Sequence, residues 1–238
     1  MPVYILNTEY LNFPPVEDAE DDGMIAVGGD ITPERMLVAY SEGIFPWYDP
    51  ADIPVWYCPN PRFVLYPHRL KVSKSMRQLL RAKKYTVTFD TCFDEVVRSC
   101  GTIAREGQED PYNTWISDEM MASCHALHQL GFMHSVEVWD QDGALVGGLY
   151  GGVLGRCFFG ESMFAKASNA SKFGFIMLVK NLQEQGFQLV DCQIYSDHLL
   201  SLGAEEIPRP RFMEQLKANI DEVKKEDWTN RFRTDFEF

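Results

Sequence analysis

HSVEVWDQDGALVGGLYGGVLGRCFFGESMF, residues 134–164, is the stretch that decides the fold class of this chain. It is typical of strands that follow one another through tight turns, at Asp142-Gly143 and at Leu154-Gly155. Its paired glycines allow another part of the backbone to approach closely. The stretch therefore predicts a meander of antiparallel strands.

Segments on both sides of the meander carry helix signals. A hydroxyl side chain that can cap the first turn precedes three of them: Thr32, Ser73 and Ser117. The segment after residue 168 is mostly apolar, so its helix must be buried. The predicted helices cover residues 33–42, 73–84, 93–100, 118–130 and 169–186, and another lies within 203–216.

Strands are predicted at residues 62–67, 85–90 and 189–195, in addition to the meander. The proline- and aromatic-rich stretch 45–62 is predicted to be a rigid loop that lines a surface. The sum is an α+β protein. We expect a small N-terminal domain, residues 1–62, and a larger domain, residues 63–238, with a mainly antiparallel sheet flanked by helices.

The charge of the chain is unevenly distributed. Its formal net charge is −13, which by itself disfavours a nucleic acid as partner. Residues 53–89, however, contain no Asp or Glu but eight cations: Arg62, Arg69, Lys71, Lys74, Arg77, Arg81, Lys83 and Lys84. Four of them, Lys74, Arg77, Arg81 and Lys84, recur at spacings of three and four, so they share one helix face. This basic face indicates either one anionic partner or an ordinary solvated helix.

Several kinds of site are disfavoured by motifs that the sequence lacks. No run of about 18 apolar residues could span a membrane, and the N-terminus has no secretory signal pattern. The six cysteines form no C-x-x-C pair, which disfavours zinc and suits a reduced, cytoplasmic protein. No P-loop or G-x-G-x-x-G motif would hold a nucleotide. We therefore expect no cofactor, no metal and no membrane contact.

LVDCQIYSDH, residues 189–198, is the strongest candidate for chemistry. Its alternation predicts a strand whose one buried face includes Ile194. Asp191 and Gln193 then share the opposite face, about 7 Å apart. A carboxylate beside a carboxamide can position and polarise a reacting group. The simpler interpretation is a sheet face that meets water.

Eight motifs occur in the order of a known family across nearly the whole chain: GGDITPERMLVAYSEGIFPW, TWI, GFMHSVEVW, LVGGLYG, GESMF, NASK, DCQ and SLGAEEIPR. Together they resemble the bacterial leucyl/phenylalanyl-tRNA–protein transferases. The resemblance implies transfer of leucine or phenylalanine, less often methionine, from aminoacyl-tRNA to proteins that begin with Lys or Arg. Such a product is marked for degradation by the N-end rule. The resemblance also implies a larger domain similar to the GNAT acyltransferase fold.

The resemblance assigns roles to the polar pair. Gln193 matches the residue proposed to accept the proton of the acceptor amine, with Asp191 polarising the network. A carboxamide oxygen accepts hydrogen bonds but is a very weak base, so we expect Gln193 to orient the amine instead. Asp191 is expected to hold the positive charge that grows on the nitrogen, or to attract the cationic N-terminal residue.

The resemblance also implies a pocket for the donor amino acid. Glu161 is expected to bond its amino group, and Trp47 and Trp115 are expected to stack on the 3′-terminal adenosine. The apolar candidates, each of which could instead be plain core, are Leu149, Phe158, Met163, Phe175 and Val190. Ser196, where the family has Asn, is a candidate for a secondary polar contact.

The basic face is expected to bind the tRNA acceptor stem through its phosphates. Its candidate residues are Lys71, Lys74, Arg77, Arg81, Lys83 and Lys84. The expected partners are Leu-tRNA, Phe-tRNA and proteins with N-terminal Lys or Arg, and the expected state is a monomer. Two alternatives stay open: an N-acyltransferase that uses acyl-CoA, and a tRNA-binding protein without catalytic activity.

Overall fold

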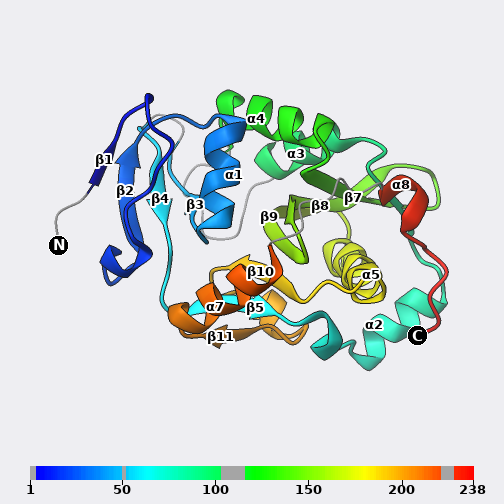
Figure 1. The fold of residues 1–238 in the computed structure, drawn as a ribbon. Helices are drawn as coiled ribbons and strands as arrows, with labels where there is room; N and C mark the ends of the chain where they lie inside the picture. The colour runs from blue at the N-terminus through cyan, green and yellow to red at the C-terminus, as the bar shows by residue number, and fades with distance from the viewer. Residues whose placement is uncertain (1–3, 50–51, 103–115, 221–227) are drawn as a thin grey trace.

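The computed structural model describes residues 4–49, 52–102, 116–220 and 228–238 (Figure 1). Within these residues, seven strands form the larger sheet, in the order β11-β5-β10-β9-β8-β7-β6. Neighbouring strands are antiparallel except for the parallel pair β9 and β10. The strands are β5 Arg62–Leu65, β6 Thr86–Phe89, β7 Met133–Trp139, β8 Leu145–Leu154, β9 Cys157–Ala165, β10 Leu189–Gln193 and β11 Glu205–Ile207. The predicted α+β class with a mainly antiparallel sheet is confirmed.

The predicted meander is confirmed as β7, β8 and β9. Its two turns contain Gly143 and Gly155, and both have positive φ, 80° and 55°. At Gly155 a Cβ atom would lie 2.1 Å from the carbonyl oxygen of Asn219, so only glycine fits against the end of the last long helix. At Gly147 a Cβ would lie 2.7 Å from the Cβ of Ala170, which lets a helix pack directly on the sheet.

Helices cover both faces of this sheet (Figure 1). Helix α5, Ala170–Glu184, packs on one face, and helices α3, Phe93–Thr102, and α4, Asp118–Gln129, pack on the other. Successive strand residues alternate between the two cores. Leu149 packs with α5, whereas the next residue, Tyr150, packs with α3 and α4. Helices α2, Lys74–Arg81, and α8, Trp228–Arg231, join the α5 side, and α7, Arg209–Asn219, joins the other.

A smaller sheet of four described strands lies at the N-terminal end, in the order β1-β2-β4-β3. Its strands are β1 Tyr4–Leu6, β2 Met24–Gly28, β3 Phe45–Pro46 and β4 Val55–Tyr57, and helix α1 is Pro33–Ser41. The stretch predicted as a loop therefore contains two short strands, β3 and β4. All four strands precede residue 62, and β5 of the larger sheet begins at Arg62. The division into residues 1–62 and 63–238 stays a prediction.

The three predicted capping residues all cap helices. The hydroxyls of Thr32, Ser73 and Ser117 accept hydrogen bonds from the backbone N–H three residues later, at 3.4, 3.2 and 3.0 Å. These bonds satisfy donors that the first helical turn leaves free. Helices α1, α2 and α4 therefore begin where their local sequence predicts. None of the helices in the described ranges is long and apolar enough to cross a membrane.

The strand predicted at residues 189–195 is shorter than expected. β10 ends at Gln193, whose φ of 64° is left-handed, so the alternation stops there. Ile194, predicted to be buried, is 41% exposed. Asp191 is fully buried, so the prediction of a single buried face is wrong. A short helix, α6, Asp197–Leu200, follows.

Candidate active site

A pocket of about 760 Å³ opens where the two parallel strands part. The pairing of β10 with β9 stops at Asp191 and Phe159, although β9 continues to Ala165. From Gly160 onward β9 no longer pairs with β10 in the larger sheet, and its residues 160–165 line the pocket together with the end of β10. Separation of neighbouring strands gives access to side chains from both faces of the sheet.

Most of the predicted site residues line this one pocket. They are Trp47, Leu149, Phe158, Glu161, Met163, Phe175, Val190, Asp191, Gln193 and Ser196. The apolar members come from β8, β9, β10 and α5, which makes one wall suitable for an aliphatic or aromatic group. Trp47, 47% exposed, lies at the mouth and packs edge-on against Tyr57 at a centroid distance of 6.0 Å. Trp115 lies outside the described residues.

Glu161 is the carboxylate at the polar end of the pocket. Its Oε1 accepts a hydrogen bond from the hydroxyl of Tyr40 at 2.9 Å and another from Nε2 of Gln193 at 3.0 Å. Burial raises the pKa of Glu161 to about 7, and the charge of Asp191 adds to the rise, whereas these two hydrogen bonds oppose it. Glu161 therefore changes its charge near neutral pH, which makes it a functional candidate on physical grounds.

Asp191 forms a bidentate ion pair with Arg62 of β5. Its two carboxylate oxygens lie 2.8 and 2.6 Å from Nε and Nη2 of Arg62, and both side chains are at most 1% exposed. Oδ1 also accepts the backbone N–H of Gln193 at 2.9 Å. The charge of Asp191 is thus balanced inside the protein. Arg62, one of the eight cations counted between residues 53 and 89, is therefore buried and does not contribute to an exposed basic surface.

Gln193 is held at both its backbone and its side chain. Its N–H is bound by Asp191 and its amide donates to Glu161, so its carbonyl oxygen is the atom left to accept a hydrogen bond. The left-handed backbone is uncommon for a residue with a Cβ and costs about 1–3 kcal/mol. Such strain persists where surrounding contacts hold it, and here the holding contacts are these two bonds.

Several residues of the site were not predicted from the sequence, among them Tyr40, Arg62 and His198. Tyr40 and Arg62 reach it from parts of the chain more than 120 residues away, so no local pattern indicates them. His198 follows the strand and lines the pocket. Burial lowers the pKa of His198 to about 4, so its imidazole is neutral near pH 7.

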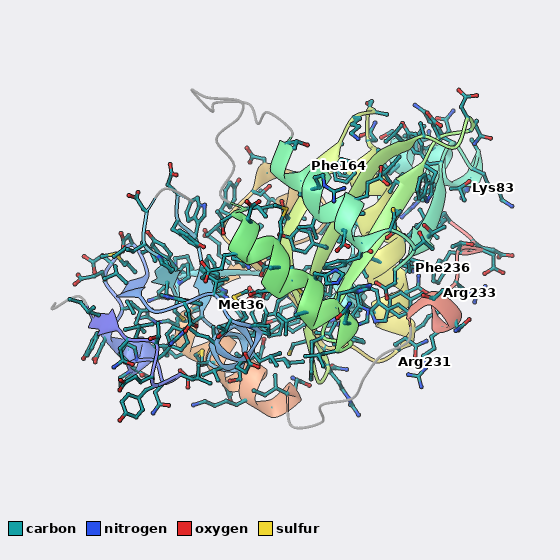
Figure 2. The ribbon with its side chains drawn as sticks, turned by 90° about the horizontal axis from the view of Figure 1, so that it is seen from above. Met36, Lys83, Phe164, Arg231, Arg233 and Phe236 are labelled. Carbon is teal, nitrogen blue, oxygen red and sulfur yellow. The ribbon has the colours of Figure 1, made fainter. Side chains whose placement is uncertain are left out.

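The cations of the predicted basic face are not part of the pocket lining. All six, Lys71, Lys74, Arg77, Arg81, Lys83 and Lys84, are exposed. Figure 2 shows Lys83 at the opposite end of the molecule from the N-terminal sheet, near Arg233 and Phe236 of the C-terminal segment. Arg81 donates a hydrogen bond to the carbonyl oxygen of Phe238 in that segment. The basic face is therefore a separate surface from the pocket.

The fold and the pocket define a class of protein: an α+β protein whose pocket joins an apolar wall to the hydrogen-bonded side chains of Glu161 and Gln193. Residues 64–217 match the family described as leucyl/phenylalanyl-tRNA protein transferase, and residues 29–60 match the N-terminal domain of the same family. The chain belongs to the leucyl/phenylalanyl-tRNA protein transferase family.

Individual relatives agree with this assignment. The leucyl/phenylalanyl-tRNA–protein transferase of Syntrophus aciditrophicus (strain SB) is 51% identical over 208 residues, which cover 87% of this chain and 85% of the relative. The transferase of the same name from Myxococcus xanthus (strain DK1622) is 47% identical over 231 residues, 96% of this chain and 97% of the relative.

Solved structures show a more distant likeness. L-PGS from Bacillus licheniformis gives a TM-score of 0.38 at 12% identity, over 73% of this chain and 54% of that chain. A GCN5-related N-acetyltransferase from Kribbella flavida gives 0.36 at 12% identity, over 71% and 59%. Likeness at this level does not bear on the family, which the sequence matches show.

Proposed function

We propose that this chain transfers leucine or phenylalanine, less often methionine, from aminoacyl-tRNA to the N-terminal Lys or Arg of acceptor proteins. The products would be marked for degradation by the N-end rule. We further propose that it acts as a monomer in the cytoplasm. The observation that carries the proposal is one pocket that joins an apolar wall to the hydrogen-bonded pair Glu161 and Gln193.

The pocket has the chemistry that the donor requires. Leu149, Met163 and Phe175 supply apolar surface for the donor side chain, and a flexible methionine suits several apolar shapes. Glu161 binds the donor's α-amino group, since a carboxylate forms a strong charge-assisted hydrogen bond with an ammonium. Trp47, an exposed residue of the pocket lining, is proposed to stack on the 3′-terminal adenosine, and Trp115 is proposed to do the same.

The reaction needs alignment more than activation, because the aminoacyl ester is already reactive. The α-amine of the acceptor, with a pKa of about 7.7–8.0, has a useful neutral fraction near pH 7. Its nitrogen bonds to the ester carbonyl carbon, the bond from that carbon to the ribose oxygen breaks, and the amine's proton passes to the ribose oxygen. Orientation alone can supply about 7–11 kcal/mol of the barrier.

Within this scheme Gln193 orients the attacking amine. Its carbonyl oxygen accepts a hydrogen bond from the amine while its NH₂ group stays bound to Glu161. The role that we propose for Asp191 is more limited than the role expected from the sequence. Since Arg62 balances its charge, Asp191 is not available as the main attraction for a cationic N-terminal residue. It acts through the backbone of Gln193.

One assay tests the proposal. The protein is mixed with radiolabelled Leu-tRNA and a protein that starts with Arg, and the expected result is label in the protein. A matched acceptor that starts with Ala should stay unlabelled. Binding of the tRNA without transfer would contradict the proposal in favour of a tRNA-binding protein. Acyl transfer from acyl-CoA, without use of the aminoacyl-tRNA, would contradict it in favour of the alternative enzyme.

A further inference from the structure

The buried guanidinium of Arg62 lies behind the pocket, and nothing in the scheme above uses it directly. It is not part of the pocket lining, and only 1% of its surface is exposed, so it does not touch a substrate. Its guanidinium carbon lies over the rings of Phe45 and Phe212, 4.7 and 4.5 Å from their centroids. Two aromatic faces and a bidentate carboxylate together leave Arg62 one orientation.

Stability alone does not explain such a pair. Taking two charges out of water costs several kcal/mol for each ion, and a well-packed apolar pair of similar volume is often equally stable. One further donor, Nη1 of Arg62, is buried without a hydrogen-bond partner among the described residues, which adds to this cost. The pair is therefore expected to supply geometry that apolar side chains would not.

One atom, Oδ1 of Asp191, connects the Arg62 guanidinium to Gln193. Oδ1 of Asp191 is 2.8 Å from Nε of Arg62 and 2.9 Å from the backbone nitrogen of Gln193. The same oxygen thus connects the fixed guanidinium to the residue whose φ of 64° ends the strand. Without the fork of Arg62, the Asp191 carboxylate could rotate, and the N–H of Gln193 would lose its fixed acceptor.

We propose that Arg62 is a positioning residue for the transfer reaction, which holds the Gln193 amide in place through the carboxylate of Asp191. This inference rests on the proposed function. The chain of contacts runs from β5 through Asp191 to Gln193 and ends on Glu161. Because Asp191 is paired at its side chain, its part in the reaction is transmitted through the backbone of its neighbour.

The test is a double-mutant cycle between Arg62→Lys and Gln193→Ala. Lysine keeps the charge but cannot form the two-pronged bond. If Arg62 acts through Gln193, Arg62→Lys lowers kcat by about 100-fold in the wild-type background, with a smaller change in KM for aminoacyl-tRNA. In the Gln193→Ala background the same change costs at most about twofold, because the positioned group is already gone.

Arg35→Lys is the matched control. Arg35 is also fully buried and also pairs with an aspartate, Asp30, at 2.9 Å, but it does not line the pocket. Thermal unfolding of both lysine variants measures how much stability each loses. Arg35→Lys should leave kcat of the folded protein within about twofold of wild type in both backgrounds.

Each outcome decides the inference. Equal losses of kcat from Arg62→Lys in the two backgrounds would show a general structural role and overturn it, as would unchanged kcat in the wild-type background. If Arg62→Lys does not fold, the cycle is repeated with Arg62→Gln, which keeps an N–H donor for Asp191. Absence of transfer by the wild-type protein would contradict the proposed function, and so is distinguishable from these results.

Discussion

Nε2 of Gln193 donates a hydrogen bond of 3.0 Å to Oε1 of Glu161, which joins β10 to β9 beyond the point where the strands stop pairing. The bond bridges the pocket between two parted strands. It also decides how the Gln193 amide is turned, because its NH₂ group faces Glu161 and no hydrogen bond to its carbonyl oxygen is found among the described residues. The chemistry proposed for the pocket depends on this bond.

Replacement of Gln193 by Glu tests whether orientation or basicity matters. The variant puts a second carboxyl group beside Glu161, and two such groups close together share one proton. The donor to Glu161 is then lost or altered, so we expect kcat to fall on the order of 100-fold near pH 7. The measurement is kcat as a function of pH. Activity close to wild type, with a new acidic limb in the profile, would show instead that residue 193 works as a base.

Glu161 predicts a pH dependence of donor binding. Its pKa is about 7, because burial disfavours the charged form. The Glu161 side chain therefore loses its proton as the pH rises from about 6 to 8. We expect 1/KM for aminoacyl-tRNA to rise over this range in the wild-type protein and to lose that rise in Glu161→Gln. An unchanged profile in the variant would assign the rise to another group, such as the amines of the substrates.

The same pKa predicts how stability depends on pH. In the folded protein Glu161 binds its proton more tightly than in the unfolded chain, where the ordinary value is 4.5. Its contribution to the free energy of unfolding is therefore fully present below pH 4.5 and is lost as the pH rises to about 7. Chemical unfolding of wild type and Glu161→Gln between pH 4.5 and 8 should show this difference. A constant difference over that range would contradict the raised pKa.

Phe175 predicts the selectivity of the pocket. Phe175→Leu replaces a ring in the pocket wall by a smaller side chain, so the pocket becomes larger. The larger pocket should favour phenylalanine over leucine as the transferred group. We expect the ratio of kcat/KM for Phe-tRNA to that for Leu-tRNA to rise about tenfold, the size of effect that one methylene produces in an apolar pocket.

Phe173→Leu on the same helix is the matched control for this change. Phe173 is similarly buried, but it packs edge-on against Tyr85 and does not line the pocket. Both variants should lose about 1–2 kcal/mol of stability. A similar shift of selectivity in both would mean that the helix, and not the side chain of Phe175, sets the shape of the pocket.

The basic face predicts a selective loss of tRNA binding. The double variant Lys74→Glu/Arg77→Glu on α2 should raise KM for aminoacyl-tRNA about tenfold and reduce the salt slope of binding by about two. KM for a short aminoacyl-adenosine, which lacks the acceptor stem, should change much less. Arg81 is left unchanged because it contacts the C-terminal segment.

The control for this variant uses two cations of α7, a helix well away from α2 in Figure 1. Arg211 and Lys217 are exposed there, and Arg211→Glu/Lys217→Glu changes the net charge by the same amount. This control should leave KM for aminoacyl-tRNA within about twofold of wild type. An equal rise of KM in the two double variants would contradict the docking role of the basic face. An equal rise of KM for aminoacyl-tRNA and for the short aminoacyl-adenosine would contradict it as well.

Local features of the chain were predictable from its sequence alone. The caps at Thr32, Ser73 and Ser117 are bonds between residues three apart, and the turns at Gly143 and Gly155 use conformations that glycine adopts freely. The meander and the buried helix follow from residue patterns of the same short range. Resemblance to a family added the pocket residues, because motifs far apart in the chain occur in a known order.

Tertiary structure alone decided how the polar groups meet. Arg62 and Asp191 are 129 residues apart, and Tyr40 and Glu161 are 121 apart, so no periodicity indicates either contact. Alternation predicted a strand through Tyr195, but the ladder ends at Gln193, where the bond from its N–H to the Asp191 side chain accompanies a left-handed turn. The physical reason is range: the sequence encodes which elements form, whereas a buried charge finds its partner only when those elements pack.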